Sequence, residues 1–491
     1  MIRYGFLFYP TVVLIFGLSL YFTLVSGERL ESNRAGSGQR VESSAVTASS
    51  SQPNIPDDIA SNIRGILREN LRVPLSILLL QLIVILVTAK LIDGVFRKLG
   101  QPPVIGEMIA GILLGPSLLG IVFPKALTFL FPPSSMGALK LLSQVGIVLF
   151  MFIVGLEMNA QQLKEKARAA VMISHASIMA PFLLGVAVSL LVYRRFAPSD
   201  IPFTQFALFM GVAMSVTAFP VQARIIEERG LSNSYLGTTA IACAAVDDVT
   251  AWCALASVIA IVKLNGIVGS ALTIFLALIF TAFMLFVLKP QLNRRFGKDV
   301  VIRENDNGWV TGALALTFVS AYFTEVIGVH ALFGAFLAGA VMPAAGAVRS
   351  FLNDNRATFS SAALLPLFFA FTGLRTQISL LDDWQSWLVC AGIIAVAIAG
   401  KLGGGMLAAR WCGMSWSDSF AIGALMNTRG LMELVVLNIG YDLGILTGRV
   451  FAIMVLMAIV TTCMTGPLLS FVKSGNREGA NRERLPLTAS L

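Results

Sequence analysis

The chain has 491 residues, of which 56% are hydrophobic and 13% charged, with a mean hydropathy of +0.80. Soluble domains carry roughly a quarter charged residues, so this composition excludes a soluble enzyme, a nucleic-acid-binding domain and a disordered protein. The net charge of +9 fits a membrane protein, in which lysine and arginine gather in cytoplasmic loops. The five cysteines show no CxxC spacing, and we expect no disulfide framework, zinc site or cofactor.

The N-terminal segment, residues 1–26, is apolar from Tyr4 onward and is preceded only by Arg3. It reads equally well as an uncleaved signal anchor or as a signal peptide, because Val25-Ser26-Gly27 offers a small-residue cleavage site. Residues 27–70 are dominated by Ser, Gly, Arg, Asn and Pro. This composition predicts a disordered linker, which we place outside the cell membrane.

Residues 71–473 form a series of apolar segments, each about as long as a helix that crosses a bilayer. A membrane β-barrel would instead show short alternating segments. We therefore expect an all-α polytopic membrane protein whose core has about thirteen transmembrane helices, followed by a short basic tail at 474–491. The expected spans are 73–96, 104–121, 137–158, 170–193, 203–223, 236–262, 265–288, 308–327, 329–345, 361–380, 386–410, 416–440 and 449–473.

Basic residues predict the orientation of these spans. They follow the odd-numbered spans, as at Arg97 and Lys98 after the first and at Lys473 and Arg477 after the last. The pair Arg194-Arg195 after the fourth span is the exception. Positively charged loops stay in the cytoplasm, so the core should begin outside and end inside a plasma membrane or bacterial-type inner membrane.

Two glycine-containing stretches resemble each other. In residues 105–116 and in residues 333–343, a small residue is followed five positions later by the glycine of an Ala-Gly pair, which is Gly111 or Gly339. A proline then ends each stretch. The second and the ninth span are seven steps apart, an odd number, so the two copies have opposite orientation. Inverted repeats of this kind are typical of secondary transporters. The alternative is that the glycines only serve close helix packing.

Two adjacent carboxylates, Asp247 and Asp248, lie near the middle of the sixth span. Charged groups at that depth are costly and usually functional. Neighbouring side chains on a helix diverge by about 100°, so one carboxylate can face a partner helix and the other a cavity. Two close carboxylates cannot both ionise freely there, and such a site binds either a proton or a small cation. A hydrogen-bonded packing pair is the alternative interpretation.

A buried charge of the opposite sign, Lys401, is expected in the eleventh span, beside glycines that permit close helix approach. One of the aspartates is its obvious partner. The alternative is that Lys401 extends along the helix toward the cytoplasmic interface.

Two spans look interrupted. The fifth contains Ser215 and Thr217 shortly before Pro220, which cannot donate a backbone hydrogen bond. The twelfth contains a dense polar run that a lipid-facing helix would not tolerate: Asn427, Thr428, Arg429, Gly430 and Glu433. Both segments predict broken helices, whose ends direct backbone dipoles at an ion site. Arg429 and Glu433 are four residues apart and can also form a purely structural pair.

The chain resembles the monovalent cation:proton antiporter-2 superfamily, and in particular plant cation/H⁺ exchangers and Kef-type membrane domains. The resemblance covers residues 73–473. It rests on stretches that occur in order, among them Gln101-Pro-Pro-Val-Ile-Gly-Glu107, Ser215-Val-Thr-Ala-Phe-Pro220, Val246-Asp-Asp-Val-Thr-Ala-Trp252, Gly328-Val-His-Ala-Leu-Phe-Gly-Ala-Phe336, Gly400-Lys401 and Asn427-Thr-Arg-Gly-Leu431.

The resemblance implies a thirteen-span bundle with inverted repeats, two crossed broken helices at 203–223 and 416–440, and a homodimer. It also implies that Asp248 carries the ion while Asp247 pairs with Lys401. We therefore expect a secondary antiporter that exchanges H⁺ for K⁺ or Na⁺ by alternating access. A pH-gated cation channel and a non-transporting membrane sensor on the same scaffold stay open as alternatives.

Overall fold

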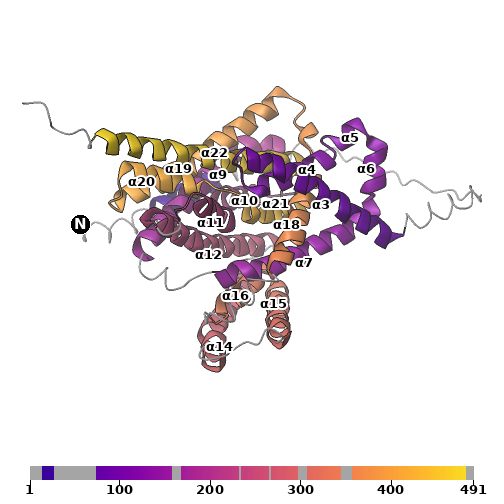
Figure 1. Cartoon of the computed structure of the whole chain (residues 1–491), viewed down its shortest axis with the longest axis horizontal. Coiled ribbons are helices and arrows are strands. Elements are labelled where there is room, and N and C mark those ends of the chain that lie inside the picture. Colours follow the sequence, from indigo (N-terminus) through magenta and orange to yellow (C-terminus); the bar gives the residue numbers. More distant parts are fainter. Residues whose placement is uncertain are drawn as a thin grey trace, which may run out of the picture.

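The computed structural model describes residues 14–26, 73–157, 167–231, 234–264, 267–296, 307–343 and 357–482. Regular structure within these ranges is helical throughout, which confirms the all-α prediction (Figure 1). The predicted linker at 27–70 lies outside the described residues, as do the first part of the N-terminal segment and the end of the basic tail. Residues 14–26 form a helix that packs on the bundle, with the Phe16 ring centred 5.6 Å from that of Phe182.

The helices of the first half follow the predicted spans closely. They are α3 (Pro74–Lys98), α4 (Pro103–Leu114), the short α5 (Leu119–Val122) and α6 (Pro124–Leu130), α7 (Pro133–Glu157), α9 (Ala167–Phe196), α10 (Phe203–Ser215), α11 (Phe219–Glu228) and α12 (Tyr235–Leu264). Prolines begin α3, α4, α6 and α7. An amide hydrogen at the first position of a helix has no acceptor within that helix, so its absence in proline costs no hydrogen bond there.

The second half begins with α13 (Ile267–Ala282), which continues through a π-helical turn, η1 (Phe283–Leu288), into α14 (Lys289–Phe296). It goes on with α15 (Asn307–Ile327), α16 (Ala331–Val341), α18 (Ala357–Arg375), the 3₁₀ turn η2 (Ile378–Leu380), α19 (Trp384–Trp411), α20 (Trp416–Met426), α21 (Leu431–Asp442) and α22 (Gly448–Arg482). Several helices extend beyond the predicted limits, notably α14 and α22. Hydropathy detects only the apolar part of a helix, whereas backbone hydrogen bonding continues into polar sequence.

Nine helical segments of the described chain are long and apolar enough to cross a membrane, and shorter apolar helices accompany them. Their burial differs greatly. In the segment Phe275–Arg295 only 6% of the most apolar window is buried, against 94% in Trp416–Asp442. The former therefore presents its side chains to the surroundings, whereas the latter lies at the centre of the molecule, where polar residues can be sheltered from lipid.

The helices pack as two groups, and each group contains helices from both halves of the chain. In one, which we name the scaffold, α3–α4 packs on α18 and α15–α16 packs on α7. In the other, which we name the crossing bundle, α9 packs on α10 and α12, and α19 packs on α20 and α22. Corresponding contacts recur in both halves of the chain, and α9 contacts α19 where the halves meet. Contacts between scaffold and crossing bundle are much sparser, chiefly those between α18 and α21.

The two glycine stretches of the sequence occupy corresponding places in this arrangement. A methyl group on Gly111 of α4 would lie 2.2 Å from the carbonyl oxygen of Ala370 in α18. A methyl group on Gly339 of α16 would lie 2.0 Å from that of Phe152 in α7. Both distances are far below van der Waals contact, so each glycine permits a close helix approach. The repeat and the packing interpretation therefore describe the same feature.

Candidate functional site

The fifth predicted span is interrupted in the crossing bundle. Helix α10 ends at Ser215, α11 begins at Phe219, and the backbone between them is extended at Val216 and Ala218. Pro220 occupies the first turn of α11. Proline has no amide hydrogen, so a continuous helix would leave the carbonyl of residue 216 without its donor. The break places those polar backbone groups where other elements can bind them.

The twelfth predicted span is interrupted in the same way. Helix α20 ends at Met426 and α21 begins at Leu431, with residues 427–430 outside both helices. A methyl group on Gly430 would lie 2.9 Å from a methyl carbon of Val221 in α11. The absence of a side chain at this position thus lets the second break lie directly against the first broken helix.

Hydrogen bonds join the two breaks. The amide of Ala218 donates to the carbonyl oxygen of Thr428 over 3.0 Å, and the hydroxyl of Thr217 donates to that of Met426 over 3.2 Å. Backbone groups that the breaks expose are therefore satisfied across the crossing rather than by water. In Figure 1 α10, α11 and α21 lie together in the middle of the molecule.

A buried arginine occupies the negative end of α10. Arg429 donates to the carbonyl oxygens of Ala213 and Met214 over 3.2 and 2.6 Å. These carbonyls belong to the last turn of α10, where the helix dipole and unpaired oxygens favour a cation. The same guanidinium lies 3.3 Å from Glu433. Arg429 itself precedes α21, so this pair forms around the start of that helix rather than along one helical face.

Lys401 of α19 is fully buried and ion-paired with Asp247. Its ammonium nitrogen lies 3.0 Å from Oδ2 of Asp247 and 2.5 Å from the hydroxyl oxygen of Thr217. Two serines of α9 complete the surroundings: Ser177 accepts from Lys401 over 3.4 Å, and Ser174 donates to Asp247 over 3.3 Å. The Lys401 side chain therefore does not extend to the membrane interface, and its charge is compensated inside the bundle.

Asp248 differs sharply from its neighbour. Its side chain is buried, yet neither carboxylate oxygen has a hydrogen-bond partner within the described structure. The backbone N–H of Phe219, at the positive end of α11, acts on this carboxylate without meeting hydrogen-bond geometry. A buried carboxylate without hydrogen-bond partners is costly, so this group is suited to bind a proton or a cation.

The buried charges near the crossing do not balance. The three carboxylates are Asp247, Asp248 and Glu433, and the two cationic groups are Lys401 and Arg429. One negative charge is therefore left over when all five are ionised. A proton or a monovalent cation neutralises it equally well, whereas a divalent cation would leave an excess positive charge.

The remaining predicted residues have different surroundings. Ser215 donates back to Val212 within α10, and Thr428 donates to Thr465 of α22. The side-chain amide of Asn427 is buried and has no partner for its oxygen or its nitrogen in the described structure. Ser215 is thus bound within its own helix, whereas Asn427 offers a free oxygen at the break.

Sequence reasoning missed the hydroxyl groups that hold these charges in place. Ser174 and Ser177 of α9 contact the Asp247–Lys401 pair, and Thr462 of α22 exchanges two hydrogen bonds with the backbone of Arg429. The available signal was weak, because small hydroxyl residues are common inside membrane helices and usually bond to their own helix.

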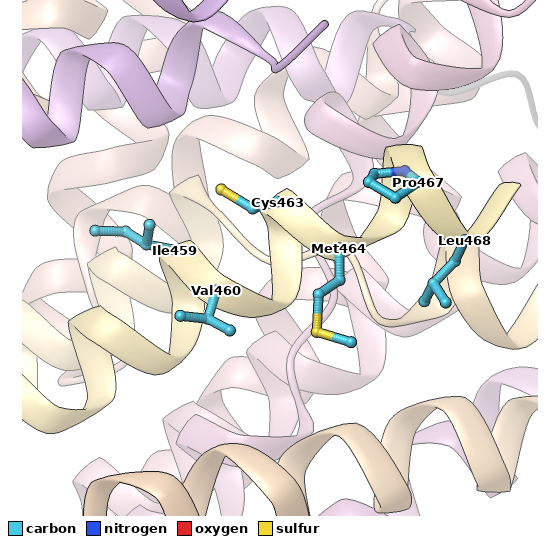
Figure 2. A pocket seen from close by; sticks show the side chains of 6 residues that line it. All are labelled: Ile459, Val460, Cys463, Met464, Pro467 and Leu468. Carbon is cyan, nitrogen blue, oxygen red and sulfur yellow. The ribbon is translucent and has the colours of Figure 1, made fainter. Parts of the chain in front are cut away.

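A hollow along α22 differs in character from the crossing. It is lined by the side chains shown in Figure 2: Ile459, Val460, Cys463, Met464, Pro467 and Leu468. None of these side chains offers the oxygen ligands that alkali cations prefer. It is therefore no candidate for the ion site.

Comparison with known proteins gives a match to one family over most of the chain. Residues 83–473 match the family described as sodium/hydrogen exchanger, transmembrane. The Na(+)/H(+) antiporter NhaS4 of Synechocystis sp. is 42% identical over 402 residues, which are 80% of this chain and 97% of that protein.

Two eukaryotic relatives are longer. Cation/H(+) antiporter 17 of Arabidopsis thaliana is 39% identical over 84% of this chain and 52% of its own length. K(+)/H(+) antiporter 1 of Saccharomyces cerevisiae is 33% identical over 85% of this chain and 48% of its own length. The chain therefore spans about half the length of these relatives.

A solved structure shares the fold. The sodium proton antiporter MjNhaP1 from Methanocaldococcus jannaschii superimposes with a TM-score of 0.54, covering 82% of this chain and 97% of that one. The two sequences are 16% identical, so the likeness concerns the arrangement of the helices.

Proposed function

The chain belongs to the sodium/hydrogen exchanger family, and we propose that it exchanges H⁺ for K⁺ or Na⁺ across its membrane by alternating access. Asp248 carries this proposal, because its buried carboxylate has no partner and the charges around it leave one negative charge over. Antiporters of sodium and of potassium among the relatives support the general activity.

Competition at one carboxylate produces the coupling. Asp248 holds a proton or a cation but not both, because either one removes the excess negative charge. When a cation binds, neutral oxygens at the breaks replace part of the water that surrounds it. The side-chain oxygen of Asn427 is available for this, because it has no hydrogen-bond partner in the described structure. Entry of the cation therefore displaces the proton, and protonation releases the cation.

The Asp247–Lys401 pair has a second role in this proposal. It fixes α12 against α19 and α9, so that Asp248 keeps its position beside the crossing. The hydroxyl of Thr217 links Lys401 to the break itself. If Lys401 releases a proton whenever a cation binds, each cycle moves net charge, and exchange responds to membrane potential.

The decisive experiment measures cation-driven dissipation of a pH gradient in proteoliposomes. Asp248→Asn should abolish coupled exchange with K⁺, Na⁺ and Li⁺, while the fold survives because the Asp248 oxygens make no hydrogen bonds to lose. Asp382→Asn, on an exposed loop, is the matched control and should exchange normally.

Each other outcome points to a different site or a different function for this protein. Cation-driven proton movement that persists in Asp248→Asn rejects this site. Cation flux without counter-movement of protons in the parent chain identifies a channel, and the absence of both fluxes identifies a sensor. The order of K⁺, Na⁺ and Li⁺ in the same assay gives the selectivity.

Orientation and assembly belong to the same proposal. Basic residues in the last turns of α3, α14 and α19 are taken as cytoplasmic, which places the start of α3 outside. We also expect a homodimer. Labelling of cysteines introduced at opposite ends of α3 tests the orientation, and mass measurement of the purified protein in a nanodisc tests the dimer.

A further inference from the structure

A cavity of about 220 Å³ with both apolar and polar walls lies between the scaffold and α21, which packs on α10 and α22 of the crossing bundle. Its walls come from α7, α16, α18 and α21, together with Glu325 near the end of α15. The sequence stretch at Gly328–Phe336, which the ion site does not explain, supplies His330 and Leu332 to this wall. The cavity therefore lies on the boundary between the two groups of helices.

One continuous face of α21 borders the cavity. The lining residues Val435, Asn438, Ile439 and Asp442 follow the spacing of neighbours on a helix. Val435 lies about 6 Å along the axis from the start of α21, where the break ends. The cavity thus extends from the end of α21 toward the crossing.

The cavity changes character along its depth. Along α21 the lining begins with the apolar Val435 near the crossing and ends with the polar Asn438 and Asp442. Ile147, Val148, Leu332 and Phe368 add apolar surface, and Gln144 and Glu325 add polar groups. An apolar floor of this kind excludes a hydrated cation, because nothing there replaces its water. The passage toward the crossing is therefore closed at Val435 and its neighbours.

Asp442 holds the mouth of the cavity together. Its carboxylate lies 2.5 Å from Arg375 of α18 and 2.8 Å from Lys140 of α7. Arg375 also donates to Asn438 over 2.8 Å, and its guanidinium lies 4.6 Å from the centre of the Tyr441 ring. Asn438 in turn donates to Thr372 over 2.8 Å. Two scaffold helices thus bind the end of α21, while other contacts between the groups are sparse.

We infer that this cavity is the passage by which the cation enters or leaves at the Asp442 end, and that the contacts of Asp442 with Arg375 and Lys140 keep it closed. The inference rests on the proposed alternating access. Asp442 acts as a positioning residue, because it lies about 16 Å along α21 from the break and does not touch the ion site. Opening requires these ion pairs to separate so that Val435 can move away from the scaffold floor.

The test measures how fast a small, charged, membrane-impermeant maleimide labels Val435→Cys in the full chain in nanodiscs. The native cysteines give the baseline in the parent. Asp442→Asn should raise the labelling rate of Val435→Cys about fivefold, a population shift consistent with losing two partly exposed ion pairs. Leu434→Cys is the matched control, because Leu434 is the buried neighbour that does not line the cavity.

A selective increase at Val435→Cys supports the inference. An unchanged rate overturns it, and equal increases at both positions overturn it as well, because they indicate general loosening. Lys140→Gln removes the same contact from the scaffold side at a half-exposed position and should reproduce the effect if Asp442→Asn folds poorly.

Exchange in proteoliposomes separates this inference from the proposed function. For Asp442→Asn we expect a changed turnover with a cation KM within about twofold of the parent, since the ion site is remote. If Asp442→Asn raises labelling selectively but the parent protein does not exchange cations for protons, the passage is supported and antiport is rejected. Full exchange in the parent without selective labelling would retain antiport and reject the passage.

Discussion

Replacing Lys401 by Met should destabilise the protein strongly, because it leaves the buried carboxylate of Asp247 without its cationic partner. Met has a similar volume, so little packing is lost. Asp247 would keep only the 3.3 Å hydrogen bond from Ser174 in a site with no solvent exposure. Breaking a buried ion pair from one side costs about 3–5 kcal/mol. The expected loss is largest at alkaline pH and smaller at acidic pH, where the remaining carboxyl group can be buried with its proton.

The assay is thermal unfolding of the purified protein at a fixed heating rate, at pH 8 and at pH 5. A loss of that size should lower the apparent Tm by roughly 5 °C or more at pH 8. The double variant Asp247→Asn/Lys401→Met is the matched control. It removes both charges together, and such replacements are often neutral or stabilising.

Two results would refute this reasoning. If Lys401→Met unfolds at the parent temperature at pH 8, the pair does not contribute as its geometry indicates. If the double variant is less stable than Lys401→Met, the loss comes from packing and not from an uncompensated carboxylate. A larger Tm decrease at pH 5 than at pH 8 would contradict the assigned sign of the charge.

Two further changes test the crossing and the scaffold. Thr217→Val removes the hydroxyl that binds Lys401 and the carbonyl of Met426, so the apparent cation KM should rise about threefold to thirtyfold at two pH values, and Thr217→Ser should restore it. An unchanged KM would remove this hydroxyl from the site. Gly339→Ala should lower the yield of folded protein and its Tm, because its methyl group would meet α7, whereas Gly392→Ala faces open space and should behave like the parent. Equal behaviour of the two glycine variants in size-exclusion chromatography would show that the close packing of α16 on α7 is dispensable.

The sequence by itself determined the fold class and the places where the helices break. Hydropathy is a local property, and the bilayer demands long apolar segments whose backbone groups are satisfied internally. The interruption just before Pro220 is equally local, because a missing amide hydrogen is visible in the sequence. The polar run at 427–433 indicates a broken helix for the same reason, since lipid cannot accommodate it.

Only the tertiary structure decided which atoms meet at the crossing. Lys401 contacts Asp247 across 154 positions of the chain, Thr217 across 184 and Ser177 across 224. No local pattern encodes such distances, because they depend on how α9, α12 and α19 pack around both breaks. The same packing leaves Asp248 without a partner while satisfying its neighbour. Adjacent aspartates look alike in a sequence, and they differ here because a helix directs consecutive side chains to different surroundings.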